Sequence, residues 1–156
     1  NRASIMASLG DALTTGRTAG TGTAVVFIDL DDFKNVNDDF GHAIGDDVLV
    51  RVARRLRAAV RRNDLVGRIG GDEFLVVCPE VAQPAEAFEV AERVARHLAL
   101  DLDVVGTSRR QRASIGVACS TDSSTAPDAL IRAADTAMYE SKRAGEGRPV
   151  LADLVS

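Results

Sequence analysis

The chain has few of the residues that build metal centres or disulfide frameworks in small proteins. Its 156 residues include two cysteines, Cys78 and Cys119, and two histidines, His42 and His97. The cysteines end two separate apolar runs and show no metal-ligand spacing. We therefore expect two buried thiols in a reducing compartment and no disulfide framework.

Long apolar runs and an excess of basic residues are also missing. No stretch approaches the roughly 20 apolar residues that span a bilayer, and no secretory signal pattern is present. A net charge of −4 argues against a surface for nucleic acid. These absences predict a cytoplasmic chain without direct membrane contact, and its length predicts one domain over residues 1–156.

The apolar pattern predicts helices and strands that alternate along the chain. Strands are expected at residues 24–28, 65–69, 74–78 and 114–118, with a short apolar segment at 150–151. Helices are expected at residues 2–13, 46–60, 84–98 and 125–144, a loop at 18–23 and a polar turn at 107–111. Asp46 and Asp47 suit the N-terminus of the second helix as capping acids. This order predicts an α/β (α+β) fold with a central mixed sheet of about five strands flanked by helices.

A glycine turn joins two of the predicted strands. In Gly70-Gly71-Asp72-Glu73-Phe74, two glycines allow a tight bend and leave room for a bulky anion. The two acids that follow are hard oxygen ligands of the kind that Mg²⁺ prefers. The turn is either a site for a metal–phosphate complex or an ordinary solvated hairpin.

Acidic residues also follow the apolar strand at residues 24–28. Asp29 and Asp31 are two positions apart on an extended segment, so their side chains should point to one side. Acids at the mouth of an apolar strand are costly unless a cation or hydrogen-bond donors compensate them. Considered alone, the pair is better explained as a solvated strand end or a helix cap. Hairpin acids placed beside the same strand end would favour a metal–nucleotide site instead.

Several short motifs occur in order along nearly the whole chain. They are Phe27-Ile28-Asp29-Leu30-Asp31-Asp32-Phe33-Lys34, Asn37-Asp38, Gly41-His42, Gly45-Asp46, the glycine turn, Ala113-Ser114-Ile115-Gly116-Val117, Ala134-Asp135 and Ala137-Met138-Tyr139. Together they resemble the GGDEF diguanylate cyclase domain, whose core is similar to those of nucleotidyl cyclases and polymerase palms. The resemblance implies condensation of two GTP molecules into cyclic di-GMP, with release of two pyrophosphates, in a homodimer.

The resemblance also implies which residues hold metal. Asp29, Asp72, Glu73 and the carbonyl of Leu30 would bind two Mg²⁺ or Mn²⁺ ions per active site. Asp72 and Glu73 are the implied catalytic residues, and Glu73 is either a metal ligand or the group that helps to deprotonate the 3′-hydroxyl.

Substrate contacts follow position by position from the same resemblance. Asn37 and Asp46 match the guanine-reading residues, and a capping role for Asp46 is compatible with this. The implied phosphate contacts come from Phe33 (through its amide), Lys34, Gly70, Gly71, Lys142 and Arg148. Lys142 is equally well explained as a cation at a helix C-terminus. The chain has Glu146 where the family often has arginine. Arg148 is the candidate substitute, but the Glu146 carboxylate beside it should repel a triphosphate.

Arg61-Arg62-Asn63-Asp64 resembles the family's inhibitory RxxD site. Arg61 and Asp64 would bind the cyclic di-GMP product, and Arg93 would add a secondary contact. A local salt bridge at a helix end is the alternative explanation. This match predicts feedback inhibition by the product.

Two other functions remain open. The first alternative is a catalytically weak GGDEF module that binds GTP or cyclic di-GMP and regulates a neighbouring domain. A different nucleotidyl cyclase is disfavoured by Asn37 and Asp46. The initial Asn1-Arg2 resembles the tail of the family's N-terminal element, so we expect a piece of a longer multidomain protein.

Overall fold

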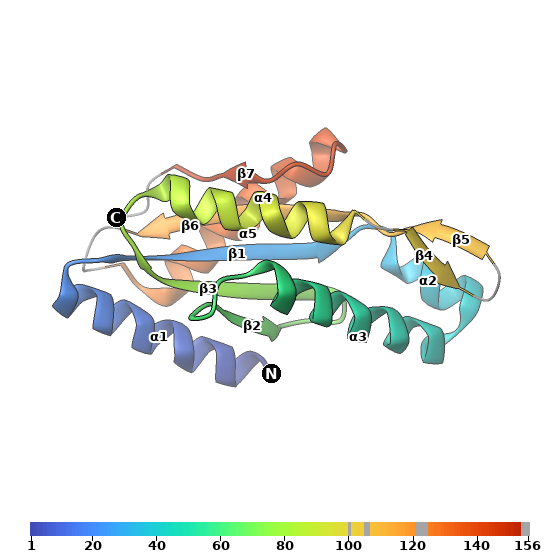
Figure 1. Ribbon diagram of the computed structural model, residues 1–156, viewed down its shortest axis with the longest axis horizontal. Coiled ribbons are helices and arrows are strands. Elements are labelled where there is room, and N and C mark those ends of the chain that lie inside the picture. Colours follow the sequence, from blue (N-terminus) through green and yellow to red (C-terminus); the bar gives the residue numbers. More distant parts are fainter. Residues whose placement is uncertain (100, 105–106, 121–124, 154–156) are drawn as a thin grey trace.

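A five-stranded mixed sheet forms the centre of the molecule (Figure 1). The computed structural model describes every residue except 100, 105–106, 121–124 and 154–156, and only the backbone of 101–104 and 107–109. The strand order is β2-β3-β1-β6-β7, antiparallel throughout except for the pair β6–β7. The strands are β1 (Gly22–Leu30), β2 (Leu65–Arg68), β3 (Glu73–Val81), β6 (Ala113–Ser120) and β7 (Val150–Leu151). The predicted fold class is therefore confirmed.

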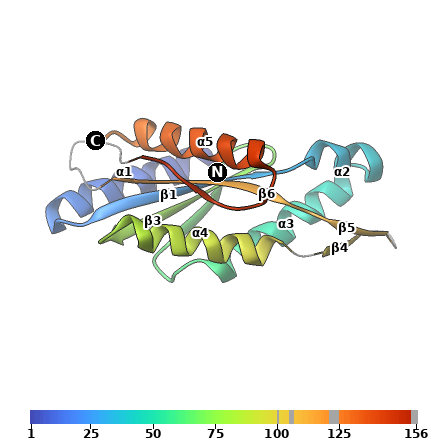
Figure 2. The same cartoon turned by 90° about the horizontal axis from the view of Figure 1, so that it is seen from above.

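Helices cover both faces of this sheet. Figure 2 shows α1 and α5 on one face, α3 and α4 on the other, and α2 beyond the end of β1. The helices are α1 (Arg2–Ala19), α2 (Phe33–Phe40), α3 (His42–Ala59), α4 (Pro84–Leu98) and α5 (Pro127–Ala144). In the described part of the chain, no helix combines the length and the apolar character needed to cross a bilayer.

The central strand β1 is buried on both faces, which explains its continuous apolar run. Val25 and Phe27 belong to the core beneath α1 and α5, whereas Val26 and Ile28 belong to the core beneath α3 and α4. Because side chains alternate along a strand, Asp29 continues the row of Val25 and Phe27. The strand thus delivers Asp29 to the α1/α5 face at the edge of the core.

Helix α5 lies unusually close to β6 at Gly116. A β-carbon on Gly116 would lie 2.1 Å from the carbonyl oxygen of Ala134 and 2.2 Å from the amide nitrogen of Met138. The last turn of α5 is held by Ser141, whose Oγ accepts from the Ile115 N–H (3.1 Å) and donates to the Arg148 carbonyl (2.7 Å). These contacts fix the position of Lys142, the next residue.

The first helix is longer than the sequence suggests. The sequence predicts a helix over residues 2–13 and a loop at 18–23, but α1 continues to Ala19 and β1 begins at Gly22. Gly16 lies within the helix, at a position where a β-carbon would lie only 2.8 Å from the Thr21 carbonyl oxygen. Glycine fits there because it has no side chain. The helix ends instead at Gly20, whose φ of 75° is left-handed. Both boundary predictions were wrong, because the glycine that ends the helix is the later one.

Two further predictions were wrong around the second helix and the polar turn. Helix α3 begins at His42, so Asp46 and Asp47 lie in its second turn and do not cap it; Gly41 occupies the N-cap position. Helix α2 was not predicted. The segment expected as a polar turn contains β5 (Thr107–Arg110), which pairs with β4 (Asp101–Val104) in a separate two-stranded sheet.

The cysteines are both buried and free, as predicted. Burial raises the pKa of the Cys78 thiol strongly and also raises the pKa of the Cys119 thiol. Neither thiol is therefore suited to act as a nucleophile.

Candidate active site

The exit of β1 brings together acids from two distant parts of the chain. Asp29 is paired directly with Glu73 on β3 and with Ser114 on β6. Directly paired residues carry their side chains on the same face of a sheet. The Leu30 N–H donates to the carbonyl oxygen of Asp72 at 3.0 Å, which ties the glycine turn to the end of β1. The hairpin predicted from the sequence is confirmed, and its acids lie beside the strand end.

These carboxylates repel one another. Burial and then the charge of Asp72 raise the pKa of Asp29 above its ordinary value. Burial, followed by the charges of Asp29 and Asp72, likewise raises the pKa of Glu73. The Oδ1 atom of Asp29 is buried and has no hydrogen-bond partner among the described residues. An unpartnered, buried carboxylate oxygen is costly, so the site favours a cation.

Lys142 supplies part of the missing positive charge. Its Nζ donates to Oδ2 of Asp29 at 3.2 Å, and its side chain is about half exposed. This hydrogen bond raises the pKa of Lys142. The ammonium group therefore sits at the acid cluster from the last turn of α5.

The donor chemistry fits a divalent ion. Within the described residues, no three acidic, histidine or cysteine side chains converge closely enough to hold a metal as they stand. Mg²⁺ on a nucleotide, however, needs only one or two carboxylates in addition to phosphate oxygens. Asp29 and the opposed Glu73 offer that number, and the partly exposed side chains of Asp72 and Glu73 have room to turn.

Asp31 lies just beyond the end of β1 and is held in place. Its Oδ1 accepts from Ser114 Oγ at 2.7 Å, and its amide donates to the Arg112 carbonyl at 2.9 Å. The acid is therefore committed to the loop and takes a different role from Asp29.

The loop after Asp31 turns sharply into α2. Asp32 has a left-handed φ of 56°, a strained conformation for a residue other than glycine. The turn places Phe33 and Lys34 in the first turn of α2, where helix amides lack partners within the helix. The side chain of Phe33 is buried and Lys34 is exposed. The Phe33 amide and the Lys34 ammonium thus follow the acid cluster directly, which suits an anion.

Asn37 and Asp46 come from different helices and are brought together by a close contact between α2 and α3. Asn37 is on α2, and its amide group rests against Gly45 of α3, the residue before Asp46. Sequence reasoning singled out the Asn37 and Asp46 pair but missed the part that Gly45 plays. The available signal was a glycine inside an amphipathic helix, where it lowers helix stability without a packing reason.

Asp46 also lines a groove of about 360 Å³ between α3 and the edge strand β2. Its apolar walls include Leu49, Val66 and Phe74. An acid at the end of an apolar groove suits a flat, partly polar ring that carries hydrogen-bond donors.

The structure describes both Arg148 and Lys142 and shows no contact between their side chains. The Arg148 side chain is 82% exposed, and its Nε lies 3.8 Å from the Glu146 carboxylate. The expected phosphate contact from Arg148 therefore requires its side chain to move.

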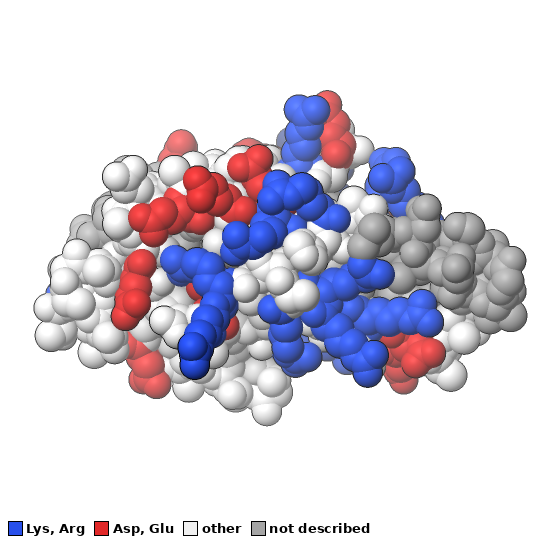
Figure 3. Space-filling view, in the orientation of Figure 1, with Lys and Arg blue, Asp and Glu red and all other residues white. Residues whose placement is uncertain are grey.

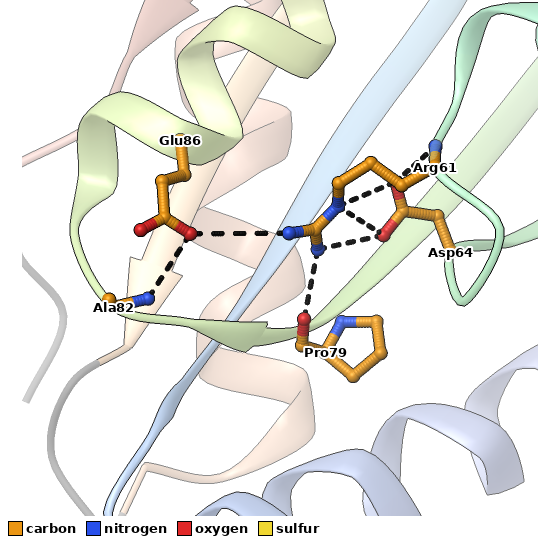
Figure 4. Close-up of polar contacts among 5 residues, drawn as sticks. All are labelled: Arg61, Asp64, Pro79, Ala82 and Glu86. Carbon is orange, nitrogen blue, oxygen red and sulfur yellow. Dashed lines mark hydrogen bonds and ion pairs between the residues drawn. The ribbon is translucent and has the colours of Figure 1, made fainter.

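Arg61 and Asp64 form a local salt bridge (Figure 4). Arg61 Nε donates to both Asp64 oxygens at 3.0 and 3.1 Å, and Nη2 donates to Asp64 Oδ1 at 2.8 Å and to the Pro79 carbonyl at 2.9 Å. The remaining nitrogen, Nη1, lies 4.0 Å from Glu86. The Asp64 side chain is fully buried. The pair braces the end of α3 against β3 and α4, so only Nη1 is left for a ligand.

Arg93, the third residue of the expected product site, reaches the same end of α3. Its Nε donates to the carbonyl of Ala59. Figure 3 shows Lys and Arg side chains gathered on the face formed by α3 and α4. The arginines on these two helices are Arg51, Arg54, Arg55, Arg57, Arg93 and Arg96. An acidic chain thus offers one face that attracts anions.

Comparison with known proteins assigns the site to a family. Residues 1–148 match the family model described as "Diguanylate cyclase, GGDEF domain". The chain belongs to the GGDEF family of diguanylate cyclases. The recognition made from the sequence motifs is confirmed.

The GGDEF relatives include proteins of known structure. Over 155 residues the chain is 39% identical to diguanylate cyclase TpbB of Pseudomonas aeruginosa, covering 99% of this chain and 36% of TpbB. The crystal structure of the TpbB GGDEF domain has a TM-score of 0.89 at 38% identity, covering 99% of this chain and 97% of that one. The GGDEF domain of DgcB from Caulobacter crescentus, solved in complex with c-di-GMP, has a TM-score of 0.85 at 26% identity, with 97% and 90% covered. The chain thus spans about a third of the length of its curated relative.

Proposed function

We propose that this GGDEF domain is a diguanylate cyclase that condenses two GTP molecules into cyclic di-GMP and two pyrophosphates between two facing protomers. The observation that carries the proposal is the pairing of Asp29 with Glu73 at the exit of β1, with Asp72 tied to the same strand end. The raised pKa values and the unpartnered Asp29 oxygen show that this cluster favours added positive charge.

Asp29, Asp72, Glu73 and the Leu30 carbonyl are the groups that would hold two Mg²⁺ or Mn²⁺ ions. Bound there, the ions would neutralise the triphosphate and polarise the α-phosphate, which is the main contribution to phosphoryl transfer. Gly71 has open space around the position of a β-carbon, which leaves the turn accessible to a phosphate. At Gly70 a β-carbon would lie 2.7 Å from Glu73 Oε1, so the missing side chain leaves room for the Glu73 carboxylate.

In each half-reaction, the 3′-oxygen of one GTP bonds to the α-phosphorus of the other, and the bond to pyrophosphate breaks. Glu73, which is paired with Asp29 at the strand exit, either helps to take the proton of the 3′-hydroxyl or serves as a metal ligand. Lys34, Lys142, Arg148 and the Phe33 amide bind the phosphates. Two such steps close the ring, and each protomer contributes one nucleotide. At low protein concentration, the rate should therefore rise with the square of the protein concentration.

Asn37 and Asp46 read the guanine base in this proposal. A carboxylate accepts from the N–H groups of guanine, and the amide completes the pattern on the same edge. Adenine offers no matching set of donors, so GTP should be strongly preferred to ATP.

We further propose feedback inhibition by cyclic di-GMP at Arg61 and Asp64, with Arg93 as a secondary contact. Support comes from the RxxD spacing and from the exposure of Arg61, whose side chain is about one-third accessible to solvent. The product would engage Nη1 or displace part of the Asp64 salt bridge. Equal product sensitivity of the wild-type protein and an Arg61→Ala variant would exclude this site.

A regulatory module that binds GTP or cyclic di-GMP without turnover is the alternative. The Glu146 carboxylate beside Arg148 favours it, because it opposes the charge of a triphosphate. Nucleotide binding without product formation at high protein concentration would support this second function.

The direct test is chromatographic detection of cyclic di-GMP after incubation with GTP and Mg²⁺. Asp72→Ala and Glu73→Ala should abolish the product, whereas Arg17→Ala, an exposed change on α1, should not. Product formation retained by either acid variant would refute the role assigned to that residue.

A further inference from the structure

We propose that Arg110 and Arg112 bind the β- and γ-phosphates of the substrate, and then the departing pyrophosphate. This inference rests on the proposed function and adds a phosphate subsite to it. Both arginines line a cavity of about 560 Å³ that also contains Lys142, Asp31 and Asp32. The cavity therefore adjoins the acid cluster, since Lys142 is bonded to Asp29.

The main chain around the two arginines is fixed to the exit of β1. Gln111, which lies between them, is buried, and its Nε2 donates to the carbonyls of Asp31 and Arg112, both at 2.8 Å. The Asp31 amide donates to the Arg112 carbonyl at 2.9 Å. The arginines flank Gln111 in the sequence, and all three residues line the same cavity. They are thus held at a constant position relative to Asp29.

The charges in the cavity call for an anion. Within the part of the chain that the structure describes, neither Arg110 nor Arg112 forms an ion pair or a side-chain hydrogen bond. Lys142 is already paired with Asp29, and Asp31 accepts from Ser114, so the two arginines are the cations of this lining that have no partner among the described residues. Guanidinium groups bind phosphate oxygens in pairs through parallel N–H donors, so a pyrophosphate group with its metal ions matches this lining.

The same arginines compensate for the departure at Glu146. Glu146 lines a smaller, adjoining cavity of about 160 Å³ together with Arg110 and Arg112. The Glu146 carboxylate lies 3.8 Å from Arg148 Nε and borders the same cavity as the two further arginines. The positive charge that the family often supplies after Gly145 comes, in this chain, from the segment before β6.

The test compares Arg110→Gln, Arg112→Gln and the double variant with the wild-type chain. The matched control is Arg143→Gln, which removes one charge from an exposed position beside Lys142 but lines neither cavity. Calorimetric titration in the presence of Mg²⁺ measures the affinity for GTP (as a non-reactive analogue), GMP and inorganic pyrophosphate, and thermal unfolding confirms that each variant is folded. Arg112→Lys keeps the charge and should retain part of the affinity.

We expect the double variant to lose about tenfold or more in affinity for GTP and for pyrophosphate. GMP affinity should not change in that variant, and Arg143→Gln should bind all three ligands as the wild type does. Unchanged GTP and pyrophosphate binding in the double variant, an equal loss of GMP binding, or an equal loss in Arg143→Gln would overturn the subsite alone. A wild-type chain that binds neither GTP nor pyrophosphate would overturn the proposed function as well.

Discussion

The amide oxygen of Asn37 occupies the space that a side chain on Gly45 would need. A β-carbon built on Gly45 would lie 1.8 Å from Asn37 Oδ1 and 3.0 Å from its Cγ. The two residues belong to different helices, α2 and α3, so the missing side chain allows Asn37 to lie next to Asp46. Gly45 thus positions the pair that is proposed to read guanine.

Gly45→Ala should therefore weaken recognition of guanine. Because the new methyl group must displace the Asn37 amide, GTP affinity should fall by about 1–3 kcal/mol, the value of one good set of contacts to a base edge. ATP binding should change little. Competition binding with GTP and ATP measures both values, and a folded Gly45→Ala variant with wild-type preference for GTP would contradict this role.

Gly116→Ala should destabilise the domain through a clash with α5. The backbone atoms of Ala134 and Met138 leave no room for a methyl group, so we expect a loss of about 1–3 kcal/mol in the free energy of unfolding. Gly10→Ala is the matched control, because nothing lies within 4 Å of a β-carbon at this position in α1. It should gain about 0.5–1 kcal/mol from helix propensity. Urea unfolding tests both, and equal effects of the two changes would rule out the close approach.

The acid cluster should make the metal-free domain less stable as pH rises. The pKa of Glu73 is raised in the folded state, so the folded state binds more protons than the unfolded state. Stability is then highest below the ordinary carboxyl pKa, falls as pH rises through the raised pKa of Glu73, and stays low above it. Glu73→Gln lacks this charge, so in EDTA it should melt at a higher temperature than the wild type at pH 7.

The difference between Glu73→Gln and the wild type should shrink in acid, where Glu73 is protonated. It should also shrink when Mg²⁺ and GTP compensate the charge. A lower melting temperature for Glu73→Gln at pH 7 without metal would show that the ionised carboxylate stabilises the fold, against this account.

Arg61→Ala should lower stability because it leaves the Asp64 carboxylate buried and unpaired. Loss of one partner of a buried pair costs about 3–5 kcal/mol, and the partial exposure of Arg61 lowers our expectation to about 2 kcal/mol. Arg62→Ala, an exposed neighbour, should change stability by less than about 0.5 kcal/mol. Chemical denaturation compares them, and product inhibition of Arg61→Ala should be measured only where the variant is folded.

The sequence predicted the elements whose pattern is set by burial. The apolar runs of β1 and β3 were found because both faces of these strands are covered. The edge strand β2 is only partly buried and was found from its place before the glycine turn. The boundaries at Gly16 and His42 were missed, since they depend on tertiary contacts of Gly16 and on the left-handed Gly41. Strand β5 was missed because its residues are polar.

Within the candidate site, spacing identified residues but not their partners. The distance in sequence between Arg61 and Asp64 is the same for a product site and for a salt bridge, and only the structure shows the bridge. Likewise, the contact of Lys142 with Asp29 joins residues far apart in the chain, so no local pattern predicts it. The cavity role proposed for Arg110 and Arg112 depends in the same way on the buried Gln111 between them.

The most direct test of the acid cluster is the metal dependence of GTP binding, measured with a non-reactive GTP analogue in the presence of Mg²⁺ or of EDTA. The wild-type domain should bind the analogue much more tightly with Mg²⁺, and Asp29→Asn should lose most of that gain while Asp11→Asn, an exposed change on α1, keeps it. An equal Mg²⁺ effect in the wild type and in Asp29→Asn would contradict the claim that the exit of β1 holds the metal–nucleotide complex.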